Sequence, residues 1–230
     1  MKFYISPKLE QDFKDWLDTD VAHANYTFEL IRNWYARDEE GYEPIFLRAL
    51  YFSINWKSKL GNSDANSNFK TSYDVKIRKG DIVIREDGCV FMLNWQVQDM
   101  PNNQTTQAIV CNAMLSFTRH VDETVDNRGF LVEEAHEEVI VPPIPCVFSE
   151  YAGRPDYAAN YNTPGISADH LLTVQVQWNG RTKLLRTSDE FELLHSRYRI
   201  VDLVGTELDI TQQHGILNLM ARKIAGEDAP

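Results

Sequence analysis

Histidine, the most versatile side chain for metal binding and proton transfer, occurs six times in this 230-residue sequence, at widely separated positions: His23, His120, His136, His170, His195 and His214. No two of them have the three- or four-residue spacing that places two ligands on one face of a helix. The acidic residues Glu133, Glu134, Glu137 and Glu138 surround His136, but they lack the glycine turn of a calcium loop. We therefore expect no metal site, and we interpret this cluster as the solvated edge of a strand.

Candidate nucleophiles give no catalytic pattern either. The serines Ser149, Ser167, Ser188 and Ser196 lie outside any Gly-x-Ser-x-Gly context. The sequence also lacks the glycine-rich patterns that bind the phosphates of nucleotides. Cys111 and Cys146 have no cationic neighbour in sequence that favours a thiolate, so we expect them to be core thiols. We predict no cofactor and no enzymatic activity. An active site assembled in space from Asp156, His170 and His195 is an alternative hypothesis.

Residues that favour protein contacts gather in two segments. The first, residues 151–169, contains Tyr151, Arg154, Tyr157 and Tyr161, and tyrosine and arginine are enriched at contact hot spots. The second is a polar segment, residues 99–107, with Met100, Asn102 and Asn103 near its tip. We predict that these seven residues form a subunit or partner interface, because long loops in compact domains are usually functional or disordered. Alternatively, the tyrosines pack on their own sheet.

These segments are framed by predicted β-strands. Cys89, Phe91, Leu93, Trp95 and Val97 alternate with polar residues, and the alternation resumes after residue 107, which predicts two paired strands, 89–98 and 107–118. Further strands are expected at 75–85, 130–141, 172–178, 182–187, 191–194, 197–204 and 215–224. The dipeptide Asn179-Gly180 is a strong hairpin signal.

The N-terminal region has a different pattern. Leu9, Phe13, Trp16, Tyr26 and Leu30 recur at helical spacing, so residues 7–38 are expected to be helical, whereas 43–56 are ambiguous and favour a strand. The predicted organisation is an N-terminal helical segment with a possible strand (1–60), a linker (61–69), a first β half (70–145) and a second β half (146–230). The prolines Pro142, Pro143 and Pro145 mark the division between the halves. The predicted class is α+β, predominantly antiparallel β, with a small barrel or sandwich core.

A short pattern occurs twice. Lys79-Gly80-Asp81-Ile82-Val83 followed by Cys89-Val90-Phe91 has the same shape as Thr187-Ser188-Asp189-Glu190-Phe191 followed by Tyr198-Arg199-Ile200-Val201. A duplicated barrel explains this similarity, but any two hairpins of a β-protein look alike, so chance is the simpler interpretation.

Composition limits the class of partner. The formal net charge is −11, from 34 acidic and 23 basic residues, which argues against a protein that holds nucleic acid through its phosphates. The three cysteines match no disulfide framework, which favours a reducing compartment. The N-terminus lacks the apolar region of a signal peptide, and no apolar run approaches the roughly 20 residues of a membrane helix.

Motif order in residues 70–224 resembles the neck proteins of tailed bacteriophages, the head-closure or head–tail connector family. The resemblance lies in Gly80-Asp81-Ile82-Val83, the turn Asp87-Gly88, Val110-Cys111-Asn112, Ile144-Pro145-Cys146-Val147 and Arg197-Tyr198-Arg199-Ile200-Val201.

The resemblance implies a structural virion protein that assembles in the host cytoplasm into a sixfold or twelvefold ring and joins the portal and head to the tail. Its partners are then the portal or adaptor and the tail proteins, with DNA only passing through the channel, where acidic walls repel phosphate. The alternative is a monomeric β-rich module that binds carbohydrate or peptide through Tyr151, Tyr157 and Tyr161.

Overall fold

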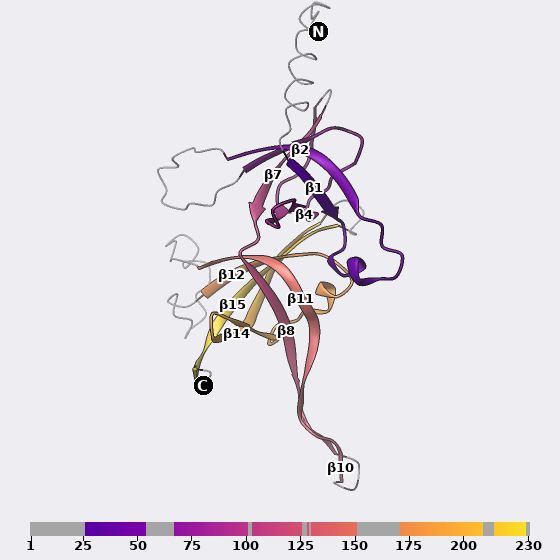
Figure 1. Ribbon diagram of the computed structural model, residues 1–230. Helices are drawn as coiled ribbons and strands as arrows, with labels where there is room; N and C mark the ends of the chain where they lie inside the picture. Colours follow the sequence, from indigo (N-terminus) through magenta and orange to yellow (C-terminus); the bar gives the residue numbers. More distant parts are fainter. Residues whose placement is uncertain are drawn as a thin grey trace, which may run out of the picture. The chain divides into compact units, whose positions relative to one another are not determined.

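Two compact units make up the chain, Met1–Val110 and Cys111–Pro230, and each contains a closed six-stranded antiparallel barrel (Figure 1). The computed structural model describes residues 26–53, 67–100, 103–125, 128, 130–150, 171–208 and 214–228. Within these ranges the elements are β-strands and two short 3-10 helices, η1 (Trp34–Asp38) and η3 (Thr182–Leu184). The described part of the chain is therefore an all-β structure.

The first barrel is built from six strands: β1 (Tyr26–Ile31), β2 (Ile45–Ser53), β3 (Ser67–Thr71), β4 (Ile82–Arg85), β5 (Val90–Leu93) and β7 (Asn103–Val110). Pairing of β3 with β7 closes it, and β6 (Gln98–Met100) pairs with the first residues of β7. Three phenylalanines occupy its centre: the ring centroid of Phe28 lies 5.1 Å from that of Phe69 and 6.2 Å from that of Phe91, both edge to face. Such aromatic pairs stabilise a core beyond their buried area.

The second barrel also uses six strands: β8 (Ala113–Val121), β11 (His136–Glu150), β12 (Leu171–Gln177), β13 (Glu190–Leu193), β14 (Ser196–Leu208) and β15 (Gly215–Asp228). Alternate residues of β12, namely Leu172, Val174 and Val176, are buried, as expected for strands with one face toward a core. Phe117 and Phe191 pack edge to face at 5.2 Å across the β8–β13 pair.

Both barrels have the same connectivity. If the six strands of each are numbered along the chain, their order around the barrel is first, second, third, sixth, fifth, fourth, and back to the first. By this correspondence β1 matches β8, β4 matches β13, and β5 matches β14. The chain is therefore a tandem repeat of one barrel topology.

The repeated sequence pattern lies at the same point of each barrel, in the turn that leads into the fourth strand. In Arg78–Asp81, the Arg78 N–H donates to Asp81 Oδ2 (2.8 Å), and the Asp81 N–H donates to the Arg78 carbonyl (3.2 Å). In Arg186–Asp189, the matching distances are 2.8 Å and 3.3 Å. We call these segments the first and second aspartate turns. Their agreement in place and hydrogen bonding favours duplication over chance as the origin of the sequence similarity.

One position of the aspartate turns requires a left-handed backbone. Gly80 has φ +86°, and its counterpart Ser188 has φ +80°. A side chain in this region costs about 1 kcal/mol or more, whereas glycine adopts it freely. We expect Ser188→Gly to raise the free energy of unfolding by about 1 kcal/mol, measured by urea denaturation. Thr187→Gly, one residue earlier and outside the positive-φ set, serves as the control; stabilisation by both substitutions, or by neither, contradicts this account.

The predicted α+β class with an N-terminal helical segment is wrong. No α-helix occurs among the described residues, and Tyr26–Ile31, expected to be helical, form β1. Tyr26 and Leu30 are four residues apart, a spacing that fits one face of a helix and also one face of a strand. Phe28, which is fully buried between them, fixes the period as two. The expected strand in 43–56 is confirmed as β2, and residues 7–25 lie outside the described part.

Prolines do not divide the chain where the sequence suggested. Pro142, Pro143 and Pro145 lie inside β11, and the β8–β11 register shifts between Val141 and Ile144. A bulge at this point lets the strand continue past residues that have no N–H to donate. The division between the two compact units instead falls between Val110 and Cys111 in the sequence, between β7 and β8. The single strand expected at 107–118 is therefore two strands in different barrels.

A second turn signal also has a different outcome. Asn179-Gly180 does not join two paired strands, because β12 pairs with β11 and β15. Instead, Asn179 Oδ1 accepts from the N–H groups of Arg181 (2.9 Å) and Thr182 (3.0 Å) and starts η3. The strand expected at 182–187 is therefore replaced by this 3-10 turn. Asparagine serves both uses, since its side chain mimics a backbone acceptor.

Candidate functional site

The predicted interface residues are only partly covered by the structure. Met100 ends β6 and Asn103 begins β7, so the expected polar segment 99–107 is largely a β6–β7 hairpin. Asn103 is fully buried and offers no contact surface. The other five residues lie outside the described part of the chain: Asn102, Tyr151, Arg154, Tyr157 and Tyr161.

Polar residues of this hairpin bind the chain's own backbone. Gln104 is buried, and its Nε2 donates to the carbonyls of Ser72 and Val75 (both 2.9 Å) while its Oε1 accepts from the Ile77 N–H (3.2 Å). The polarity that suggested a loop open to a partner thus serves an internal connection, because buried backbone groups need such partners.

Each barrel has an arginine near its aspartate turn: Arg32 directly follows Ile31, and Arg119 directly follows Thr118. Ile31 and Thr118 hold the same position in the two barrels, because each pairs with the first residue of its barrel's fourth strand. In the second barrel, Arg119 Nε and Nη2 contact the two carboxylate oxygens of Asp189 at 2.7 and 2.9 Å, and Nη2 also donates to the Leu184 carbonyl (2.9 Å). The Asp189 side chain is 1% exposed. The bidentate ion pair joins β8 to the second aspartate turn, and the bond to the Leu184 carbonyl joins β8 to η3.

The first barrel has the same residues in a different arrangement. Arg32 donates to the Lys76 carbonyl (3.2 Å), the counterpart of the Arg119–Leu184 bond, but the described contacts of Arg32 and Asp81 include no ion pair between them. Burial raises the pKa of Asp81 to about 7, although Arg78 donates a backbone hydrogen bond to it and the charges of Arg32 and Arg78 act in the opposite direction. Without a close counter-ion, desolvation dominates.

Of the two expected core thiols, Cys146 is buried, whereas Cys111 is only half-buried. Cys146 is buried and burial raises its pKa to about 12, while burial also raises the pKa of Cys111. The thiolate is the reactive form of cysteine. In an Ellman assay at pH 8 we therefore expect the reagent to modify no more than one thiol of the folded chain, that of Cys89. We expect it to modify all three thiols of the urea-unfolded chain. Rapid reaction of Cys111 or Cys146 in the folded chain contradicts the prediction.

Acidic and imidazole groups do not converge on a metal-binding arrangement in the described ranges. His120 lies 3.5 Å from Asp122, and His136 lies 3.8 Å from Glu133, both at exposed positions. Of the residues in the alternative catalytic hypothesis, His195 lies in the β13–β14 turn, whereas Asp156 and His170 lie outside the described residues.

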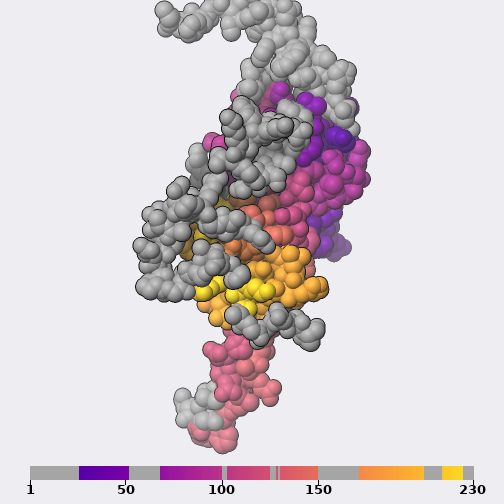
Figure 2. Space-filling view, turned by 90° about the vertical axis from the view of Figure 1, so that its left-hand side faces the viewer, coloured from indigo at the N-terminus to yellow at the C-terminus, as the bar shows by residue number. Residues whose placement is uncertain are grey.

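The most prominent surface feature is an arm that leaves the second barrel (Figure 1). The strands β8 and β11 remain paired from Thr118–Val139 to Val121–His136, beyond the last contact of β8 with β13 at Thr118. The small sheet of β9 (Thr124–Val125) and β10 (Leu131–Glu133) follows at the far end. We define the arm as residues 119–139. Figure 2 shows it as a narrow projection from the body of this unit.

Three consecutive apolar side chains lie at the end of the arm: Phe130, Leu131 and Val132 are 68, 52 and 68% exposed. A strand that packs on one face exposes only alternate residues, so three exposed apolar side chains in a row mark an exposed apolar surface. We call these residues the tip. They fall in the strand expected at 130–141 and were not predicted as a contact site. A signal was available in the run of three apolar residues between two charged segments.

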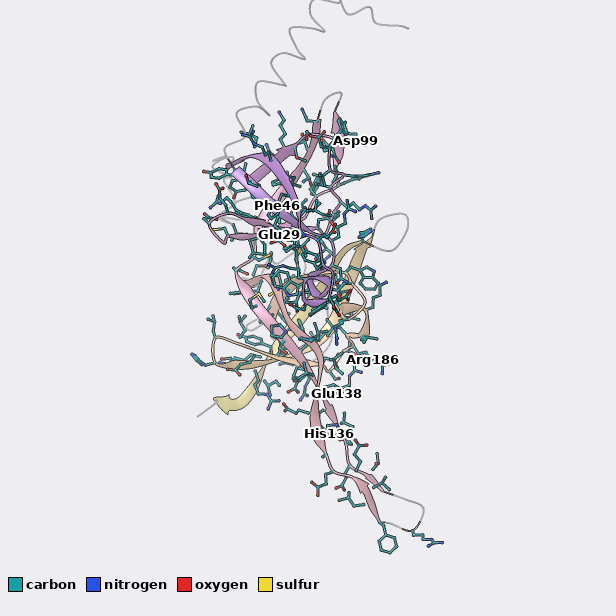
Figure 3. All side chains as sticks on the ribbon, turned by 45° about the vertical axis from the view of Figure 1, so that its right-hand side comes forward. Glu29, Phe46, Asp99, His136, Glu138 and Arg186 are labelled. Atoms are coloured by element: carbon teal, nitrogen blue, oxygen red, sulfur yellow. The ribbon has the colours of Figure 1, made fainter. Side chains whose placement is uncertain are left out.

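An ion-pair network holds the base of the arm to the barrel. Arg197 Nη2 contacts Glu137 (2.6 Å) in the arm and Glu190 (2.9 Å) in β13, and Arg199 also contacts Glu190. Figure 3 labels His136 and Glu138 along the β11 side of the arm. Networks of several charges hold a geometry better than isolated surface pairs.

Comparisons of the chain with family models, with curated proteins and with solved structures found no match. In the described residues, no helix has the length and apolar character needed to cross a membrane.

Proposed function

We propose that this chain is a structural subunit of the neck of a tailed bacteriophage, where copies form a ring that joins the portal and head to the tail and helps to retain packaged DNA. The observation that carries the proposal is the arm, which holds an apolar tip away from its barrel. Exposed apolar groups of this kind are typical of protein contact sites. The sequence resemblance described above supplies the kind of assembly.

The charge of the chain fits this role. A net charge of −11 disfavours tight binding to DNA phosphates, and an acidic channel wall lets DNA pass without adhering. In this proposal the ring has sixfold or twelvefold symmetry, and the chain assembles in the host cytoplasm and resides in the virion.

A binding module for carbohydrate or peptide is the competing hypothesis. It depends on Tyr151, Tyr157 and Tyr161, which lie outside the described residues, so the arm is the feature that favours assembly.

Cryo-electron microscopy of native particles tests the proposal. We expect density for both barrels of this chain, repeated around the axis between head and tail. Particles that carry the chain as single copies outside any ring, or that lack it, contradict the proposal.

A further inference from the structure

The tip is flanked in the sequence by acidic residues. Residues 119–139 contain seven acidic side chains and two arginines, a formal net charge of −5 out of the −11 of the whole chain. A small part of the sequence therefore carries almost half of its net charge, and it carries it beside three exposed apolar residues. This combination of acidic charge and exposed apolar side chains restricts what the tip can bind.

This charge disfavours two classes of binding partner. Nucleic acid and anionic lipid surfaces both repel a dense cluster of carboxylates. A second copy of this chain is also disfavoured as a partner, because two arms with a formal charge of −5 repel each other and the remainder of the chain is itself net acidic. The complementary surface is an apolar pocket with a rim of lysine and arginine.

We propose that the arm docks its tip, Phe130-Leu131-Val132, into an apolar pocket with a basic rim on a different structural protein of the particle. The apolar side chains supply the affinity once they are desolvated, and the surrounding carboxylates orient the approach and exclude other partners. The paired strands and the Arg197–Glu137 contact hold the arm before docking, which lowers the entropy lost on binding. This inference rests on the proposed function, since it specifies a contact of the same assembled subunit.

Site-specific photocrosslinking in assembling particles tests the inference. Phe130→p-benzoylphenylalanine keeps an aromatic ring at the tip, and Leu184→p-benzoylphenylalanine is the matched control, because Leu184 is 56% exposed but lies in η3 of the same unit. We expect position 130 to crosslink to one other particle protein, at a segment whose apolar residues are flanked by lysine or arginine, and position 184 not to reach that segment.

A variant without the apolar tip provides the second measurement. Phe130→Thr, Leu131→Thr and Val132→Thr together place β-branched, strand-forming residues at positions that are more than half exposed, so the chain should fold with nearly unchanged stability. We expect its incorporation into particles to fall at least roughly tenfold, which corresponds to about 1.4 kcal/mol. Glu133→Lys with Glu134→Lys is expected to reduce the crosslink at position 130 while leaving the tip intact.

The outcomes separate the two proposals. If the chain is absent from purified particles, both the proposed function and the docking contact are refuted. If the chain is present in a ring, three results refute only the docking contact. Position 130 crosslinks to a second copy, to DNA or to lipid; or it crosslinks no more than position 184; or the triple threonine variant is incorporated normally.

Discussion

Arg119→Ala is expected to lower the free energy of unfolding by about 3 kcal/mol, as measured by urea denaturation at pH 7. The substitution removes both guanidinium contacts to Asp189, at 2.7 and 2.9 Å, and leaves a carboxylate that is 1% exposed without its counter-ion. The loss of one partner from such a pair costs far more than an exposed ion pair contributes, because the remaining charge stays desolvated.

The tandem repeat provides the control for this experiment. Arg32→Ala removes the matching arginine of the first barrel, which donates to the Lys76 carbonyl, so we expect a loss below about 1 kcal/mol. Arg119→Lys should lie between the two, since lysine keeps the charge but not the planar pair of donors. Equal losses for Arg119→Ala and Arg32→Ala contradict the assignment of Arg119 as the main counter-ion of a buried carboxylate.

Local sequence patterns predicted the strands better than their pairing. The alternation around Phe91 and Leu93 does mark β5, and β5 pairs with β7 as expected. The same method failed at Tyr26 and Leu30, where a spacing of four residues suits helix and strand equally. It also treated Pro142 and Pro143 as a boundary, because a bulge that accommodates proline depends on the partner strand and leaves no local signal.

The functional surface was harder to predict than the fold. Phe130, Leu131 and Val132 have the composition of a core strand, and they are exposed because the β8–β11 pair continues beyond the rest of its barrel. Where the arm begins depends on the β8–β13 pair, which ends at Thr118 and Glu190, 72 residues apart in the sequence. Conversely, the polar residues Asn103 and Gln104 suggested an exposed contact loop, yet both are buried.

The repeated aspartate turn shows how much depends on tertiary contacts. Sequence alone revealed two similar segments but gave no reason to prefer duplication, since hairpins share turn residues. The common strand order and the matching Arg78–Asp81 and Arg186–Asp189 hydrogen bonds supply that reason. The same comparison reveals a difference that sequence conceals, because both barrels have the arginine but only one places it against the carboxylate.

Asp81→Asn is therefore expected to stabilise the chain at pH 8. Burial raises the pKa of folded Asp81 to about 7, above the ordinary carboxyl value of 3.8, so the folded state holds this proton more tightly than the unfolded state does. The stability that depends on the proton is fully present below the unfolded pKa and is lost as pH rises through the folded pKa. The total effect is on the order of 4 kcal/mol, and more than half of it falls between pH 5 and pH 8.

Urea denaturation of wild type and Asp81→Asn at several pH values measures the contribution of Asp81 to the pH dependence of stability, because all other titrating groups are common to both chains. The stability of the variant relative to wild type should rise with pH, and a difference that stays constant from pH 5 to pH 8 contradicts it. Asp189→Asn is the matched control at the equivalent turn, and there we expect the opposite sign at pH 8, since the amide gives up the ion pair with Arg119. The same substitution thus stabilises one barrel and destabilises the other, because stability depends on whether an arginine reaches the buried carboxylate.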